Sequence, residues 1–112
     1  TAGEVMESSY AMADGSLVLR HDVLVAAPPD RVWEEVMKSA KGERLSYIPN
    51  EMLSVRSGPE LFTVIQLLRI NDPQTTRIRM STLPFRSADE IYERLRRDNV
   101  LLLREIEQRF VK

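Results

Sequence analysis

Apolar and polar residues alternate along residues 17–25, with the period of a β-strand that has one face in a core. The even positions include Arg20 and Asp22. The odd positions form the core face: Leu17, Leu19, His21, Val23 and Val25. The pattern therefore predicts a half-buried strand whose core face includes the single histidine of the chain. The polar residues 1–16, which end in an Asp-Gly turn signal, are predicted to be an irregular lead-in or a short edge strand.

Residues 27–30, Ala-Pro-Pro-Asp, are predicted to end this strand and start a helix. Proline is tolerated in a first helical turn, and Asp30 complements the positive end of the helix. The apolar residues that follow lie on one side of a helix of about three turns. They are Val32, Trp33, Val36 and Met37. The polar segment 38–42 is predicted to end the helix.

Residues 43–83 contain stretches of strand-forming residues separated by turn formers. The predicted strands are two short ones within 43–57, one over 60–70 and one over 75–83. The turns between them are Pro49-Asn50-Glu51, Gly58-Pro59 and Asn71-Asp72-Pro73. The last two strands are predicted to form an antiparallel hairpin.

From Ser87 the apolar period becomes that of a helix. Ser87 and Glu90 have the spacing of a capping box, which predicts a helix of about 25 residues that starts at Ser87. Its apolar stripe comprises Ile91, Leu95, Leu102, Ile106 and Phe110, flanked by Tyr92 and Leu103. Only a sheet or groove of matching length covers such a stripe, so the element order predicts an α+β domain that spans residues 1–112.

The composition indicates one soluble domain and makes several classes of function unlikely candidates. The formal net charge is -1 with no basic block, so we do not expect nucleic-acid binding. No apolar run approaches the roughly 20 residues of a membrane span. With no cysteine and one histidine, neither a disulfide nor a metal site or other cofactor is expected. The oligomeric state stays open between monomer and homodimer, and the location is cytoplasmic by default with export an alternative.

Two polar residues interrupt the predicted apolar faces. His21 can act as an acid, a base or a hydrogen-bond donor to a ligand, although a core histidine paired with a carbonyl or a helix side chain is the commoner case. Asn99 lies at the centre of the helix stripe, where it either orients a polar ligand group or makes a structural hydrogen bond, even to His21. Neighbouring Asp98 falls near the edge of that face. Tyr47 and Tyr92 can each present a hydroxyl to the same space, although an aromatic at the edge of an element is commoner.

Four segments together resemble the START-like superfamily, also called SRPBCC. This superfamily includes polyketide cyclases, the birch-pollen allergen and bacterial homologues of a heat-shock ATPase activator. The segments are VLRHDVLVAAPPDRVWEEV, RLSYIPNEMLSVR, LFTVIQLLRI leading to TTRIRMS, and LLLREIEQRF. The first combines the strand, the Pro-Pro step and the Val-Trp helix in the order typical of the family.

The resemblance implies a helix-grip fold, in which a curved antiparallel β-sheet wraps around a long C-terminal α-helix, with a short helix after the first strand. It implies that a cavity between them binds an apolar or amphipathic small molecule, with His21, Asn99, Tyr47 and Tyr92 as ligand contacts. Two other functions within the superfamily stay open. One is an enzyme of the cyclase or hydratase kind in which His21 performs acid-base work, and the other is a co-chaperone-like protein-interaction module.

The chain is shorter than the resemblance implies, because family members place a second short helix and further strands before the strand at 44–49. Either the protein is a pared-down variant, or loop residues are missing from this sequence near 38–41 and 57–59. We favour missing loop residues, because loss of central strands would uncover sheet edges and leave the long helix without its sheet.

Overall fold

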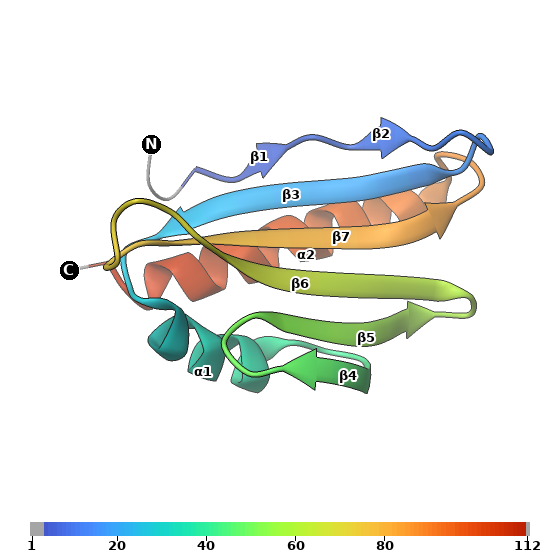
Figure 1. Cartoon of the computed structure of the whole chain (residues 1–112). Helices are drawn as coiled ribbons and strands as arrows, with labels where there is room; N and C mark the ends of the chain where they lie inside the picture. The colour runs from blue at the N-terminus through green and yellow to red at the C-terminus, as the bar shows by residue number, and fades with distance from the viewer. Residues whose placement is uncertain (1–3, 112) are drawn as a thin grey trace.

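The computed structural model describes residues 4–111, which form one antiparallel sheet and two helices (Figure 1). The strands are β1 (Met6–Glu7), β2 (Tyr10–Ala11), β3 (Leu17–Val25), β4 (Glu43–Ile48), β5 (Met52–Gly58), β6 (Leu61–Arg69) and β7 (Thr76–Phe85). The helices are α1 (Pro29–Ser39) and α2 (Glu90–Gln108). The sheet order is β1-β3-β7-β6-β5-β4, with β2 also paired to β3, so the sheet is not closed. The protein therefore has the α+β helix-grip architecture that the sequence predicted.

Strand register places one set of side chains on the inner face of the sheet, toward α2. Along β3, β7, β6 and β5 the paired residues form rows across the sheet. One row is His21, Met80, Ile65 and Leu53, and the next is Leu19, Thr82, Thr63 and Val55. Side chains alternate between the faces of a strand, so these rows lie on the same side, and the row between them, Arg20, Ser81, Val64 and Ser54, lies on the other.

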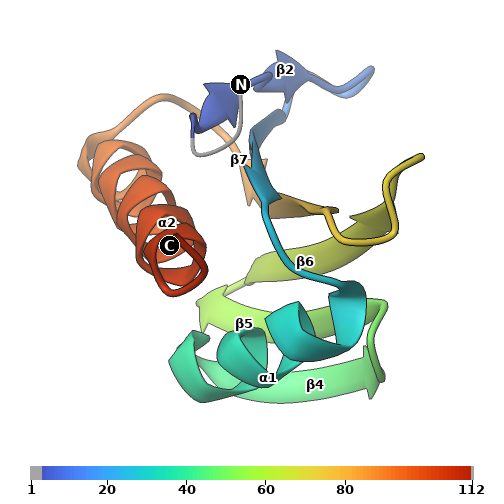
Figure 2. The same ribbon diagram turned by 90° about the vertical axis from the view of Figure 1, so that its left-hand side faces the viewer.

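Both helices contribute to one core against this inner face. Val32 and Val36 of α1 and Leu103 and Ile106 of α2 are at most 1% exposed and belong to the same buried cluster as the sheet residues. Figure 2 shows α2 lying alongside the sheet, with α1 near the β4 and β5 end. Burial of each such side chain contributes about 1.5–3 kcal/mol relative to leaving it exposed, so the helix and the sheet stabilise each other.

Helix α2 begins later and is rotated relative to the prediction. Asp89, not Ser87, is the N-cap: its carboxylate accepts a hydrogen bond from the Tyr92 backbone N–H at 2.9 Å. The helix has 19 residues, fewer than the number predicted. Its buried residues are Tyr92, Asn99, Leu103, Ile106 and Glu107, whereas Ile91 is 47% exposed. The chain has apolar neighbours at 91/92 and again at 102/103, so periodicity alone did not determine which of each pair faces the sheet.

The N-terminal segment forms two very short edge strands on β3, in line with one of the two alternatives expected for residues 1–16. Met6 pairs with Asp22, and Glu7 pairs with His21. β2 pairs with the start of β3 at Tyr10. Residues 1–3 lie outside the described part of the chain. This edge pairing places the Glu7 carboxylate next to the core histidine.

The two junctions where loop residues were expected to be missing are short connections. Residues 40–42 lead from α1 directly into β4, and a tight turn at 59–60 joins β5 to β6. The sheet is continuous across both junctions, because β4 pairs with β5 and β5 pairs with β6. All six residues of the edge strand β4 are exposed. That loop residues are missing from this sequence near 38–41 and 57–59 stays a prediction.

Gly42 is expected to be required at the junction between α1 and β4. Its φ is +104°, and a Cβ added there would lie 2.6 Å from the Arg56 carbonyl oxygen. Gly15 also has a positive φ, +86°, but open space surrounds it, which makes it a matched control. Gly42→Ala should lower the free energy of unfolding by at least about 1 kcal/mol more than Gly15→Ala, in urea titrations followed by circular dichroism. Equal losses would contradict the close backbone approach.

Peptide mapping of the natural protein by mass spectrometry checks the prediction of missing loop residues. We expect additional residues in the peptides that cover 36–44 and 54–62. Peptides whose masses match the printed sequence at both places would show that the protein is a pared-down variant with the short junctions described above.

Candidate functional site

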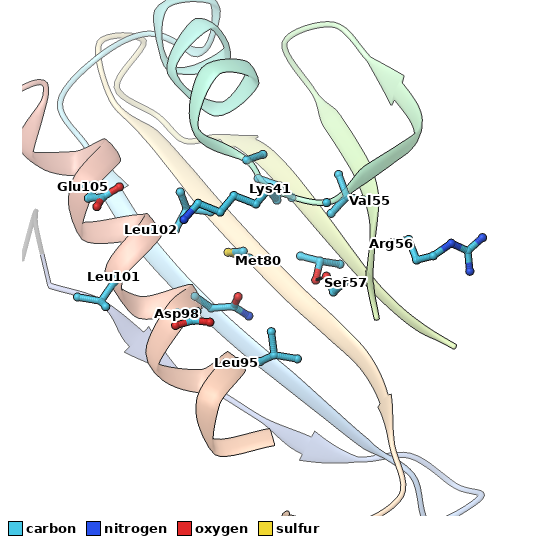
Figure 3. A pocket seen from close by; sticks show the side chains of 15 residues that line it. Lys41, Val55, Arg56, Ser57, Met80, Leu95, Asp98, Leu101, Leu102 and Glu105 are labelled. Carbon is cyan, nitrogen blue, oxygen red and sulfur yellow. Dashed lines mark hydrogen bonds between the residues drawn. The ribbon is translucent and has the colours of Figure 1, made fainter. Parts of the chain in front are cut away.

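A cavity of about 320 Å³ lies between α2 and the inner face of the sheet, where the core cluster ends. Figure 3 shows Leu95 and Leu102 on the helix side and Met80 on the sheet side. The apolar lining comprises Ala40, Val55, Ile65, Met80, Leu95, Leu101 and Leu102. A concave, largely apolar space of this size with a few polar groups has the usual character of a small-molecule site.

The polar side of the cavity is a chain of hydrogen bonds that we call the hydroxyl ladder: Asn99, Thr82, Thr63 and Ser57. Asn99 Nδ2 donates to Thr82 Oγ1 at 3.0 Å. Thr82 Oγ1 and Thr63 Oγ1 share a hydrogen bond of 2.8 Å, and Thr63 Oγ1 shares another with Ser57 Oγ. The ladder therefore runs from α2 across β7 and β6 to β5. Asn99, Thr63 and Ser57 line the cavity, while Thr82 is fully buried behind them.

The carboxamide oxygen of Asn99 faces this cavity without a hydrogen-bond partner. Asn99 is 4% exposed, and its Nδ2 bond to Thr82 is the one side-chain hydrogen bond it makes among the described residues. Within residues 4–111, the fully enclosed side-chain atoms without a partner are His21 Nδ1 and Glu35 Oε2. Asn99 Oδ1 is not one of them, so it is open to the cavity that Asn99 lines. An amide oxygen that is open to the cavity and has no protein partner can accept a hydrogen bond from a ligand, which marks this position as suited to one.

Charged residues surround the cavity on both sides. Figure 3 shows the Lys41 side chain extending toward Leu102 of the helix, whereas the Arg56 side chain points away from the space. The Arg56 guanidinium lies over the Phe62 ring, 5.3 Å from its centroid. Asp98 and Glu105 contribute carboxylates from α2. The rim thus carries both signs of charge, and the interior is neutral.

His21, the first of the predicted ligand contacts, does not line this cavity. It is 1% exposed on the inner face, and its Nε2 lies 2.9 Å from Glu7 Oε1. Because Nε2 faces a carboxylate, it donates to Glu7 Oε1, whereas Nδ1 has no hydrogen-bond partner within residues 4–111. The partner of His21 is therefore Glu7 of β1, and Asn99 bonds to Thr82 instead of to His21.

Glu7 joins the N-terminal edge of the sheet to α2. Besides His21, its carboxylate accepts from Arg96: Nε donates to Oε1 at 2.6 Å, and Nη2 donates to Oε2. The hydrogen bond from Arg96 holds the pKa of Glu7 below its ordinary value, against the opposing effect of desolvation, and the hydrogen bond from His21 adds to the lowering. The same contact raises the pKa of Arg96. This arrangement ties three elements together at the edge of the core.

The two predicted tyrosine contacts also lie away from the cavity lining. Tyr47 is 58% exposed on β4, and its ring centroid is 6.4 Å from that of Trp33. Tyr92 is buried, and its ring packs edge to face on Phe85 with centroids 4.9 Å apart. Of the four predicted ligand residues, the structure places Asn99 at the cavity, with Asp98 beside it.

Three residues of the site were not singled out from the sequence: Ser57, Thr63 and Thr82. Thr63 stands on the core face of a strand whose other core positions are apolar, and Thr82 follows Ile78 and Met80 on the core face of β7, which is the kind of signal that identified His21. Recognising them as partners needs the register of β6 on β7, which places them directly opposite each other. The alternation of residues within one strand does not reveal how that strand is paired with its neighbour.

Residues 4–111 show neither a metal-binding cluster nor a membrane-spanning helix. They contain no group of three or more His, Cys, Asp or Glu side chains arranged to hold a metal ion. No helix in that range is long and apolar enough to cross a membrane.

Known proteins resemble this chain in fold and not in sequence. No protein-family model matches it, and no curated protein does. A conserved protein of unknown function from Enterococcus faecalis, EF2215, has a TM-score of 0.70 at 11% identity, with 91% of this chain and 75% of that chain covered. CalU16 from Micromonospora echinospora has a TM-score of 0.69 at 12% identity, with coverage of 96% and 85%.

A third structure is that of the Aha1 dimer from Colwellia psychrerythraea, with a TM-score of 0.69 at 12% identity, covering 83% of this chain and 95% of that chain. At such identities the likeness shows the fold alone. The protein shares the helix-grip fold of these structures, and the comparisons do not assign it to a family.

The Glu7 contacts predict a stability that depends on pH. A carboxylate whose pKa is lowered by folding stabilises the protein above its ordinary pKa of 4.5, and this stabilisation is lost as the pH falls through the lower folded-state value. Glu7→Gln should therefore reduce the free energy of unfolding by about 1 kcal/mol at pH 7, since the side chain is partly exposed, and by progressively less below its pKa.

Glu4→Gln is the matched control, because Glu4 is an exposed carboxylate in the same segment. Urea unfolding of both variants and the wild type at a series of pH values provides the measurement. If Glu7→Gln and Glu4→Gln behaved alike at every pH, the bonds from Arg96 and His21 would have no energetic role.

Proposed function

We propose that this protein binds an apolar or amphipathic small molecule in the cavity between the sheet and α2, with Asn99 as a polar contact. The observation that carries the proposal is the Asn99 carboxamide: it is buried on the face of α2 that packs on the sheet, its nitrogen is bonded to Thr82, and its oxygen is open to the cavity without a protein partner. A ligand N–H or O–H would complete it.

The apolar lining of the cavity and the Asn99 amide both favour binding of such a molecule. Seven apolar side chains line it, and apolar surface removed from water contributes about 25 cal/mol per Å². A hydrogen bond to Asn99 adds a net contribution of about 0.5–1.5 kcal/mol and orients the ligand. The START-like fold of the chain supports a cavity at this place, although it does not identify the ligand.

The enzymatic alternative, with His21 as acid or base, has less support from the geometry. His21 is outside the cavity lining, and its Nε2 is bonded to Glu7. A general acid or base needs hydrogen-bond reach to the reacting group. We therefore propose binding in preference to catalysis, with Asn99 and not His21 as the polar contact.

Titration with N-phenylnaphthylamine, whose fluorescence rises in an apolar environment, tests the proposal. We expect saturable binding to the wild type and an affinity about 3- to 10-fold lower for Asn99→Leu, which keeps the branched shape of the side chain but removes the amide oxygen that accepts from the probe N–H.

Tyr92→Phe and Tyr47→Phe are the controls. Each removes a hydroxyl outside the cavity lining, so the affinity should stay at the wild-type value. Absence of saturable binding to the folded wild type would contradict the proposal and leave the protein-interaction module as the better hypothesis. Equal binding by Asn99→Leu and the wild type would exclude Asn99 as a ligand contact.

A further inference from the structure

The hydroxyl ladder has a direction that follows from counting protons. A hydroxyl group has one proton, so it donates one hydrogen bond. Thr82 Oγ1 already accepts from Asn99 Nδ2, and the Thr82 side chain is fully buried. Its other side-chain hydrogen bond among the described residues is the one shared with Thr63. Thr82 must therefore donate to Thr63, because the alternative leaves a buried O–H without an acceptor.

The same argument extends along the ladder to β5. Thr63 Oγ1 accepts from Thr82, so its own proton goes to Ser57 Oγ, its second partner. Ser57 Oγ then accepts, and its proton is free to point into the cavity that Ser57 lines. In this direction the ladder ends in an acceptor at Asn99 Oδ1 and in a donor at the Ser57 hydroxyl, and we take the second Nδ2 proton to point away from the cavity.

Rotating the Asn99 carboxamide by about 180° exchanges Oδ1 and Nδ2 and reverses the direction of every hydrogen bond in the ladder. If Oδ1 faces Thr82, then Thr82 donates to Asn99, Thr63 donates to Thr82 and Ser57 donates to Thr63. Nδ2 then faces the cavity as a donor, and Ser57 Oγ has only lone pairs to offer. In both directions one end of the ladder donates and the other accepts.

We propose that this coupling favours ligands with one hydrogen-bond donor and one acceptor at opposite ends of an apolar frame over ligands with an acceptor at each end, and that Thr82 enforces the selection without touching the ligand. The inference rests on the proposed function and specifies the ligand class for the same site. A neutral hydroxy ketone has this chemistry. A diketone does not, because the two ends of the ladder never donate at the same time.

The width of the ladder sets the separation of the two ligand groups. Thr82, Thr63 and Ser57 stand on three neighbouring strands, β7, β6 and β5. Three hydrogen bonds, two of them 3.0 and 2.8 Å long, join Asn99 Nδ2 to Ser57 Oγ, so these two atoms lie at most about 9 Å apart. A naphthalene substituted at opposite ends of its ring system has polar groups with roughly this separation, and it is flat enough to lie between the helix and the sheet.

Isothermal titration calorimetry with four such naphthalenes tests the proposal. They carry a hydroxyl and an acetyl group, two acetyl groups, one hydroxyl only, or one acetyl only. We expect the hydroxy ketone to bind the wild type about 3- to 10-fold more tightly than either singly substituted compound, because each additional hydrogen bond is worth about 0.5–1.5 kcal/mol. The diketone should bind no more tightly than the compound with a single acetyl group.

Thr82→Val removes the hydroxyl in the middle of the ladder and keeps the volume. Because Thr82 lies behind the cavity lining, a merely structural role would weaken all four compounds together. If the ladder couples its ends, the variant frees Asn99 and Ser57 to donate at the same time. The diketone should then gain about 3- to 10-fold relative to the compound with one acetyl group. Thr82→Ser, which keeps the hydroxyl, should retain the wild-type order of affinities.

The outcomes separate this inference from the proposed function. Equal affinities of the diketone and the hydroxy ketone for the wild type would overturn the coupling while leaving the cavity as a binding site. Unchanged selectivity in folded Thr82→Val would overturn the role of Thr82. If Thr82→Val does not fold, the wild-type order of the four compounds decides alone. Failure of all four compounds to bind the folded wild type would count against the cavity as a ligand site and so against both proposals.

Discussion

The packing of α2 against the inner face of the sheet is the constraint on which the rest of the structure depends. One face of the sheet is apolar along most of its rows, and the helices cover it. Leu103 and Ile106 have almost no exposed surface because Val23, Ile78 and their neighbours surround them. The cavity lies where this packing is incomplete, next to the row that contains Thr63 and Thr82. Site and core are thus adjacent parts of one interface.

The hydroxyl ladder also explains the rotation of α2. Two threonine hydroxyls on an inner sheet face need partners, since an unpaired buried polar group costs about 1–3 kcal/mol. Asn99 Nδ2 supplies a bond to Thr82, which requires Asn99 to face the sheet. Tyr92 is seven residues earlier, about two turns of helix, so it faces the sheet as well and Ile91 turns outward. Hydrogen bonding and apolar packing therefore agree on one orientation of the helix.

The N-terminal edge shows a different use of polar groups. β1 contributes only two residues to the sheet, which is little backbone pairing. Glu7 compensates through its side chain, because it accepts from His21 of β3 and from Arg96 of α2. His21 thus makes a structural contact with the edge strand β1, whereas Asn99 lines the cavity. His21 and Asn99, the two polar residues that interrupt the predicted apolar faces, therefore have different hydrogen-bond partners in different parts of the structure.

The sequence by itself determined the element order, because periodicity and turn formers are local properties. The alternation at 17–25, the Pro-Pro step before α1 and the turn formers at 49–51 and 71–73 predicted elements that the structure contains. It also marked Asn99 as an interruption of an apolar stripe. Only the tertiary structure decided that α2 starts after Asp89, that His21 meets Glu7 and that Thr63 lies opposite Thr82. These facts depend on strand register and on the rotation of a helix about its axis, which arise from contacts between residues far apart in the chain.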